Sequence, residues 1–242
     1  MAVPADSRRI AVSTDSDEAR ALLAQGRLAA FHYRFDVARR HLDAAIAADP
    51  DLALARIYRG GSAEEGDPVA RPSFDRALAL RHRVTAGERG LIDAFRLFLV
   101  HDDHDHAIEI FRELADAYPD DAFPPGHLAL RLLYTKRPDE AVEQFARARD
   151  RDPDFAPHHV WLGRALVRGG RPSEAEEVFV GALQRFPADT HAQFAAGAFY
   201  AAQERFDEAE GHLARAVELD PEYGEAREAL AQLAERGEAP SR

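Results

Sequence analysis

Two stretches of the chain decide its fold: GRALVRGGRPSEAEEVFVGALQRFP at residues 163–187 and GAFYAAQERFDEAEGHLARAVELDP at residues 197–221. Both begin with glycine, and each then carries an alanine, a bulky residue, a second alanine and a final proline at matching places. Three earlier segments share these four columns, with Leu114 replacing one alanine, and successive members lie 69, 34, 34 and 34 residues apart. The columns are Ala38, Ala107, Ala141, Ala175 and Ala209; Leu42, Phe111, Phe145, Phe179 and Leu213; Ala45, Leu114, Ala148, Ala182 and Ala216; and Pro50, Pro119, Pro153, Pro187 and Pro221. A fixed period of this length predicts an array of repeated units.

The columns resemble the tetratricopeptide repeat, a family whose 34-residue units each form two helices. Counted from place one to place 34, the regular units are residues 19–52, 88–121, 122–155, 156–189 and 190–223. Gly26, Gly163 and Gly197 match the family's glycine at place eight, and Tyr200 matches its aromatic place eleven. The family's tryptophan at place four is missing, and the one tryptophan, Trp161, stands at place six. The resemblance implies an all-α fold: a right-handed superhelical solenoid of antiparallel helix hairpins.

Physical chemistry supports this reading of the columns. Small residues at places eight, 20 and 27 let two antiparallel helices approach closely, while the bulky residue at place 24 fills the space between them. The proline at place 32 then ends the second helix. Ser173, Asp207 and Thr85 are each followed by glutamate three residues later, so each is predicted to be a helix N-cap.

The array is expected to be a single solenoid over residues 18–236, made of five regular units, one degenerate unit and a C-terminal cap. Residues 53–87 are the degenerate unit, because Gly60, Gly61, Gly66, Pro68 and Pro72 interrupt its helical pattern. There we expect a short helix near Leu52 to Arg59, a loop through Asp67, and a helix from about Ser73 to His82. The loop over residues 60–72 is a candidate functional hinge. Residues 222–236 are predicted to form the capping helix, and residues 1–17 and 237–242 to be tails.

Composition narrows the function. The chain has 31 basic and 43 acidic residues, a net charge of −12, which argues against binding nucleic acid or an anionic membrane. It has no cysteine, which excludes disulfides and thiolate sites. No signal-peptide core or long apolar run is present, so a cytoplasmic protein is expected. All basic residues except Lys136 are arginine and asparagine is missing, a composition typical of GC-rich bacterial genomes.

The segment from His101 to His106 holds three histidines and three aspartates. Imidazole and carboxylate are ligands for zinc, nickel or copper, so a metal site is one interpretation. The other is an ordinary polar turn with Asp105 as the N-cap, and this reading is favoured. The chain has no phosphate-binding loop, dinucleotide fingerprint, H-E-x-x-H or G-x-S-x-G motif. We therefore expect no enzyme, no catalytic residues, no metal ligands and no cofactor.

The resemblance implies that places two, five, nine, 12 and 13 of each first helix line a concave groove. An apolar groove with arginines suits a peptide that carries acidic groups, since guanidinium groups bind carboxylates bidentately. Alternatively, these arginines pair with acids of neighbouring helices. The lysine and asparagine clamp that some relatives use for chaperone termini is missing. The predicted groove residues are Arg27, Phe31, Arg96, Leu99, Leu130, Tyr134, Arg164, Arg168 and Phe194.

The sequence thus predicts an interaction scaffold that binds a protein or peptide partner in its groove, with self-association left open. The alternative is a small-molecule or metal-dependent activity at His101–His106 or at the glycine-rich break near residue 60. A closed cavity between residues 60 and 106 would favour the alternative.

Overall fold

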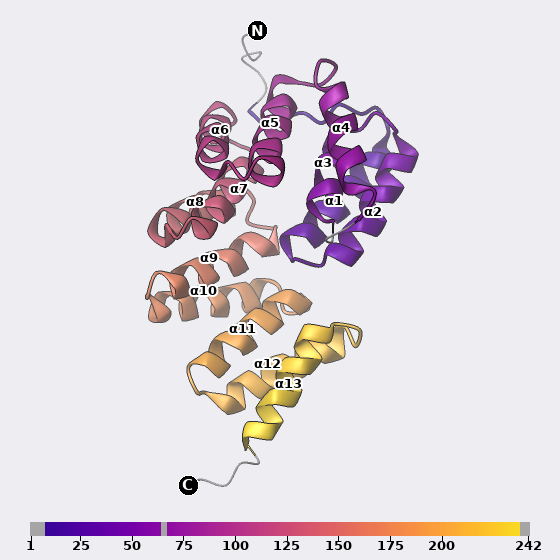
Figure 1. Ribbon diagram of the computed structural model, residues 1–242. Helices are drawn as coiled ribbons and strands as arrows, with labels where there is room; N and C mark the ends of the chain where they lie inside the picture. The colour runs from indigo at the N-terminus through magenta and orange to yellow at the C-terminus, as the bar shows by residue number, and fades with distance from the viewer. Residues whose placement is uncertain (1–7, 64–66, 238–242) are drawn as a thin grey trace. The chain divides into compact units, whose positions relative to one another are not determined.

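The computed structural model describes residues 8–63 and 67–237 (Figure 1). Within them the chain is all-helical, which confirms the predicted fold class, and no strand occurs in these ranges. The helices are α1 (Asp17–Phe31), α2 (Phe35–Ala48), α3 (Ala53–Gly61), α4 (Ala70–Leu80), α5 (Ala86–Val100), α6 (His104–Ala117), α7 (Phe123–Tyr134), α8 (Pro138–Arg151), α9 (Ala156–Arg168), α10 (Pro172–Arg185), α11 (Thr190–Ala202), α12 (Phe206–Leu219) and α13 (Gly224–Gly237).

The chain divides into two compact units. The N-terminal unit comprises the described residues up to Arg137 together with Asp150–Asp152, and the C-terminal unit comprises Pro138–Arg149 and the described residues from Pro153 on. Within each unit, consecutive helices pack as hairpins, such as α1 with α2 and α11 with α12 (Figure 1). That residues 18–236 act as a single array stays a prediction.

A left-handed residue at place 15 follows the first helix of each regular repeat. These residues have φ between +55° and +71°, and the next N–H usually bonds the carbonyl five residues earlier, as Arg137 does to Leu132 at 2.8 Å. This bond closes the first helix of the hairpin and satisfies a terminal carbonyl. The sequence analysis missed the device because only one of the five is glycine. They are Tyr33, Asp102, Lys136, Gly170 and Glu204.

The glycines at place eight do bring two helices together. A Cβ atom on Gly163 would lie 2.7 Å from the ring of Phe179, and one on Gly197 would lie 2.7 Å from Leu213. No real Cβ contact is that short, so these positions require glycine's missing side chain. The predicted packing of place eight against place 24 is therefore present in the C-terminal unit.

The degenerate unit forms the hairpin α3 and α4, and residues 64–66 of its predicted hinge loop lie outside the described residues. Gly60 does not interrupt α3, contrary to the prediction. It is place eight of this unit, and a Cβ on it would lie 2.7 Å from the ring of Phe74. The glycine is a close-packing residue there, not a helix breaker.

Residues 8–16, predicted as part of a tail, form no helix and lie against the start of α5 and the loop after α6. The backbone N–H of Ile10 donates to Asp121 at 3.0 Å, and that of Ser13 donates to the buried Glu88 at 3.0 Å. The buried side chain of Ile10 packs where Gly87 leaves room for it. This segment is therefore bound to the N-terminal unit.

The residue at which a helix begins is set more often by the left-handed turn before it than by the predicted capping motif. The capping box of Thr85 and Glu88 is confirmed at α5. Ser173 and Asp207 are not N-caps, because α10 and α12 begin earlier, directly after the N-cap residues Arg171 and Arg205. At α6 the N-cap is Asp103, which accepts from the His106 N–H, and not Asp105. The positive-φ residue before each N-cap fixes where the second helix can start.

Candidate functional site

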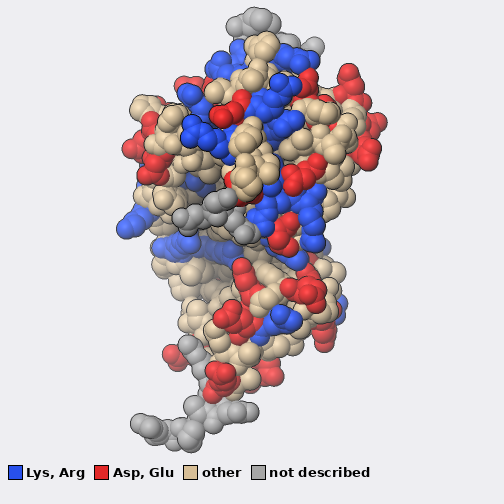
Figure 2. Space-filling view, turned by 45° about the vertical axis from the view of Figure 1, so that its right-hand side comes forward, with Lys and Arg blue, Asp and Glu red and all other residues tan. Residues whose placement is uncertain are grey.

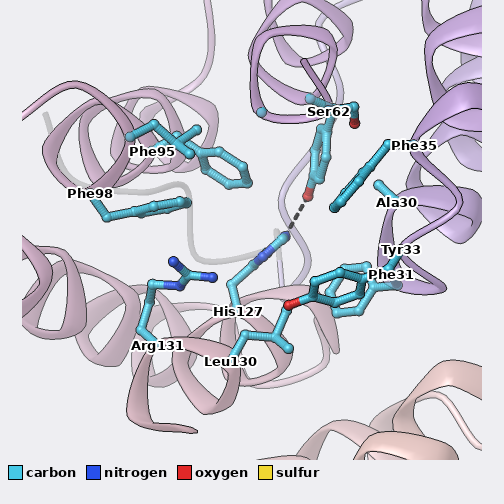
Figure 3. A pocket seen from close by; sticks show the side chains of 13 residues that line it. Ala30, Phe31, Tyr33, Phe35, Ser62, Phe95, Phe98, His127, Leu130 and Arg131 are labelled. Carbon is cyan, nitrogen blue, oxygen red and sulfur yellow. Dashed lines mark hydrogen bonds between the residues drawn. The ribbon is translucent and has the colours of Figure 1, made fainter. Parts of the chain in front are cut away.

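A pocket opens in the N-terminal unit between the first helices of its hairpins (Figure 3). Helices α1, α3, α5 and α7 supply most of its lining, and its volume is ≈ 180 Å³. The lining includes Phe31, Phe95 and Phe98, together with Ser62 from the end of α3. The pocket is thus an aromatic recess open on one side, built from segments that are far apart in the sequence.

The floor of the pocket is fixed by a buried pair of polar groups. The Tyr58 hydroxyl and His127 Nε2 lie 2.6 Å apart, drawn as the dashed line in Figure 3. Burial raises the pKa of Tyr58, so its phenol stays protonated and can donate to the imidazole. The His127 ring lies 4.9 Å from that of Phe31 and 5.0 Å from that of Phe95, between centroids. These contacts give the floor one defined arrangement.

One wall of the pocket carries the half-buried Arg131 on α7. Its guanidinium lies 4.1 Å from the ring centroid of Phe98, beneath that ring in Figure 3. Burial lowers the pKa of Arg131, and the groups that oppose this shift are the hydroxyls of Tyr33 and Tyr134. No carboxylate of the described residues forms an ion pair with it. A guanidinium stays charged even when its pKa falls, and no acidic side chain of the described residues balances this positive charge in the pocket.

The rim of the pocket exposes large apolar side chains. Tyr33 is 46% exposed and Leu99 38%, and both belong to the pocket lining. Beyond them, Val100 is 50% exposed and Tyr134 is 64% exposed, with the Tyr134 ring 4.2 Å from that of His104. Single exposed apolar residues are common, but a group around a pocket is typical of binding surfaces.

The structure brings some predicted groove residues together and separates others. Phe31, Leu99 and Leu130 all line the pocket, and Tyr134 lies at its edge, next to Arg131. Arg27 is buried behind it, with its guanidinium 3.4 Å from the ring centroid of Phe123.

The other four lie elsewhere. Arg96 is exposed and lines a separate hollow that also contains Arg81 and Asp93. In the C-terminal unit, Arg164 stacks 4.9 Å from the Trp161 ring centroid and Arg168 is exposed. Phe194 packs on Tyr223 at 5.2 Å between centroids. That all nine residues serve one groove stays a prediction.

Sequence reasoning missed the three residues that shape the pocket most, His127, Arg131 and Phe98. They stand at places six, ten and eleven, outside the groove places taken over from the resemblance, although place eleven is the family's aromatic place. The available signal was the density of aromatic residues on the first helices before residue 131.

Charged side chains elsewhere are largely balanced. Figure 2 shows positive and negative side chains next to one another over the face that it presents. Arg59 contacts both Asp43, at 2.7 Å, and Asp67, at 2.8 Å, while Asp51 joins two arginines of other segments. These arginines, none of which is a predicted groove residue, thus pair with acids of neighbouring segments, and the same pairing of the groove arginines stays an untested alternative.

The segment from His101 to His106 forms separate pairs. His104 Nε2 lies 3.0 Å from Asp102, and His106 Nδ1 lies 2.7 Å from Asp103, which raises the pKa of His106. Among the described residues, no three histidine, aspartate or glutamate side chains converge on one point. The imidazoles are arranged as partners of single carboxylates.

Comparisons with known proteins agree on the type of fold. A sequence model described as Tetratricopeptide repeat matches residues 128–190, 162–223 and 194–242. No curated protein sequence matches the chain. No helix of the described residues is long and apolar enough to cross a membrane.

Several solved structures are similar at low sequence identity. The APC/C hetero-tetramer Cut9–Hcn1 is 17% identical with a TM-score of 0.55, over 89% of this chain and 42% of that one, so our chain spans less than half its length. YrrB, described as a TPR protein with an unusual peptide-binding site, is 20% identical with a TM-score of 0.50, over 78% and 96%. MamA from Desulfovibrio magneticus RS-1 is 20% identical with a TM-score of 0.52, over 62% and 85%.

Proposed function

Because the chain belongs to the tetratricopeptide repeat family, we propose that it is a protein-interaction scaffold that holds a partner segment against its first helices. The observation that carries the proposal is the aromatic pocket on α1, α3, α5 and α7 with Arg131, which has no carboxylate partner within the described part of the chain. A repeat that filled its own interior would leave neither an apolar recess nor an unpaired charge facing outward. YrrB, a similar structure, is described as having a peptide-binding site, which supports the same class of function.

The partner in this proposal is a peptide or protein segment with acidic groups. The predicted groove arginines of the C-terminal unit, Arg164 and Arg168, lie on α9, the first helix of its hairpin. Guanidinium groups along first helices attract carboxylates and bind them with paired hydrogen bonds. In this proposal the protein is cytoplasmic and has no catalytic role.

The test uses the full-length chain and a random peptide library displayed on phage. We expect the selected peptides to be rich in Asp and Glu and to cross-link to first helices, as mapped by mass spectrometry. The double reversal Arg164→Glu/Arg168→Glu should weaken the selected peptides by about tenfold or more, since each charged contact contributes roughly 1.5–3 kcal/mol.

The matched control is Arg215→Glu, which changes an exposed residue of α12, the second helix of its hairpin. It should leave the affinity unchanged. A library that yields no binder, or binders that cross-link only to second helices, would overturn the scaffold proposal.

The pocket also lies in the segment for which small-molecule activity was the alternative prediction. It is open on one side and surrounded by exposed apolar side chains, an arrangement that suits a covering partner more than an enclosed substrate. We therefore infer that the pocket recognises a partner and does not enclose a substrate.

A further inference from the structure

We propose that the pocket is an anchor site for one aromatic side chain of the partner, and that Arg131 pairs with an acidic side chain directly beside that aromatic residue. This proposal rests on the proposed scaffold function and adds its specificity. It commits to an internal aromatic–acidic pair of an extended partner segment.

The size of the pocket sets the size of the anchor. Its volume of ≈ 180 Å³ is close to that of a roughly 150 Å³ apolar cavity that accepts a benzene molecule. One aromatic ring would therefore fill it, whereas a small side chain such as alanine would leave most of its surface uncovered.

The lining favours an aromatic ring over an aliphatic chain. Phe31, Phe95 and Phe98 contribute ring faces and edges, and such rings attract another ring by offset or edge-to-face contacts. Their positions are set before binding: the Phe95 ring lies 5.1 Å from that of Tyr58, whose hydroxyl is held by His127. A preformed site loses little conformational entropy when it is occupied.

The charge at the wall selects the neighbour of the anchor. Arg131 stacks under Phe98, which holds the plane of the guanidinium while leaving its N–H groups without a carboxylate in the described residues. In a partly desolvated site, a carboxylate that pairs with this group gains more than it would in water. The chain carries a net charge of −12, and against this acidic background the pocket presents an arginine that no carboxylate of residues 8–63 and 67–237 pairs with.

The rim indicates that the partner segment continues past the anchor on both sides. Tyr33 and Phe35 border the pocket beside α1, and Arg131 borders it on α7 (Figure 3). Leu99 of α5 also lines the pocket. The exposed side chains on both borders would be covered by residues that flank the anchor. This places the recognised carboxylate on a side chain within the segment.

The experiment measures binding of fluorescent 12-residue peptides, acetylated and amidated at their ends, to the full-length chain by anisotropy. Three peptides differ only at their centre, which reads Phe-Glu, Phe-Gln or Ala-Glu. We expect Phe-Glu to bind about tenfold more tightly than Phe-Gln and more tightly still than Ala-Glu. Arg131→Gln should remove the preference for Phe-Glu over Phe-Gln, whereas Arg40→Gln, which changes an exposed residue of α2, should keep it.

Two further arms keep the result decisive. Ala30→Phe, which would fill the pocket, should abolish binding of all three peptides, with circular dichroism checking that the fold is kept. A fourth peptide ends in Phe with a free carboxylate, and a preference for it over Phe-Glu would overturn the internal pair. An unchanged preference in Arg131→Gln would also overturn the proposal. If these peptides fail while library-selected peptides bind first helices elsewhere, the anchor site is wrong and the scaffold function stands.

Discussion

Both compact units of this protein are built from helix hairpins, but their sequences match the 34-residue repeat pattern to different degrees. In the C-terminal unit, Gly163 and Gly197 let each pair of helices close on one bulky side chain. In the N-terminal unit, Gly26 and Gly60 do the same in their hairpins, whereas Phe95 stands at this place in α5 and lines the pocket instead. The family model matches only from residue 128 onward. The pocket thus borders the first helix in which phenylalanine replaces the glycine of place eight.

The largest expected effect comes from truncating the bulky residue at place 24 of a 34-residue repeat, tested once in each compact unit. Phe111 and Phe179 are both buried, so Phe111→Ala and Phe179→Ala should each lower the free energy of unfolding by roughly 3–5 kcal/mol, measured by urea titration. The units should differ in binding, because the Phe111 ring contacts those of Phe95, Phe98 and His127.

Peptide binding measured at a temperature where both variants remain folded completes this test. Phe111→Ala should weaken the Phe-Glu peptide, and Phe179→Ala should leave it unchanged. Equal losses of binding in both variants would show that the units do not differ in this way.

Acid should destabilise the two units differently through their histidines. Burial lowers the pKa of His158 to about 3, whereas Asp103 raises the pKa of the exposed His106. Below an unfolded pKa of about 6.5, the unfolded chain binds a proton that folded His158 refuses, so this residue makes stability fall as the pH falls. The loss from pH 8 to pH 5 should be roughly 2 kcal/mol and should disappear in His158→Gln.

His106 provides the comparison of opposite sign. Its folded pKa lies above the unfolded value, so its contribution is present at low pH and is lost as the pH rises through the folded pKa. His106→Gln should therefore steepen the loss of stability in acid slightly. Urea titrations at pH 5 and pH 8 measure both variants, and a flat profile for the wild-type chain would contradict the assignment to His158.

The glycines test whether the degenerate hairpin packs like a regular one. A Cβ on Gly60 or on Gly163 would lie 2.7 Å from a phenylalanine ring. Gly60→Ala and Gly163→Ala should each lower the free energy of unfolding by about 1–2 kcal/mol, because overpacking outweighs alanine's higher helix propensity.

Gly181 is the matched control, because a Cβ there would have no atom within 4 Å. Gly181→Ala should raise stability by roughly 0.5–1 kcal/mol. If Gly60→Ala is stabilising as well, Gly60 is not a close-packing residue of its hairpin.

The fold could be predicted from the sequence because the residues that pack its hairpins recur at a fixed spacing. Ala175, Phe179 and Ala182 recur, with few exchanges, in the other regular repeats, so one spacing identifies every regular hairpin. Gly60 was within reach of the same reasoning, since counting from residue 53 puts it at place eight. The prediction that Gly60 interrupts the helix rests on its residue type alone and ignores its place in the repeat.

The pocket could not be predicted in the same way. Tyr58 and His127 are 69 residues apart and meet only through the packing of α3 against other first helices. Arg131 stands at place ten of its repeat, where none of the repeated columns falls. Columns encode contacts that repeat, whereas a site made once by several units leaves no periodic signal.

The smallest expected effect concerns the left-handed turns, which both units use. Lys136 turns one hairpin with φ +61° and Gly170 turns another with φ +71°. A non-glycine residue in this region costs about 1–2 kcal/mol, part of which glycine gives back as unfolded-chain entropy. Lys136→Gly should therefore raise the free energy of unfolding by up to about 1 kcal/mol, and Gly170→Ala should lower it by about the same amount. A Cβ on Gly170 would meet no atom within 4 Å, so a loss there would be purely conformational, and opposite signs in the two urea titrations would show that both units turn by one backbone device.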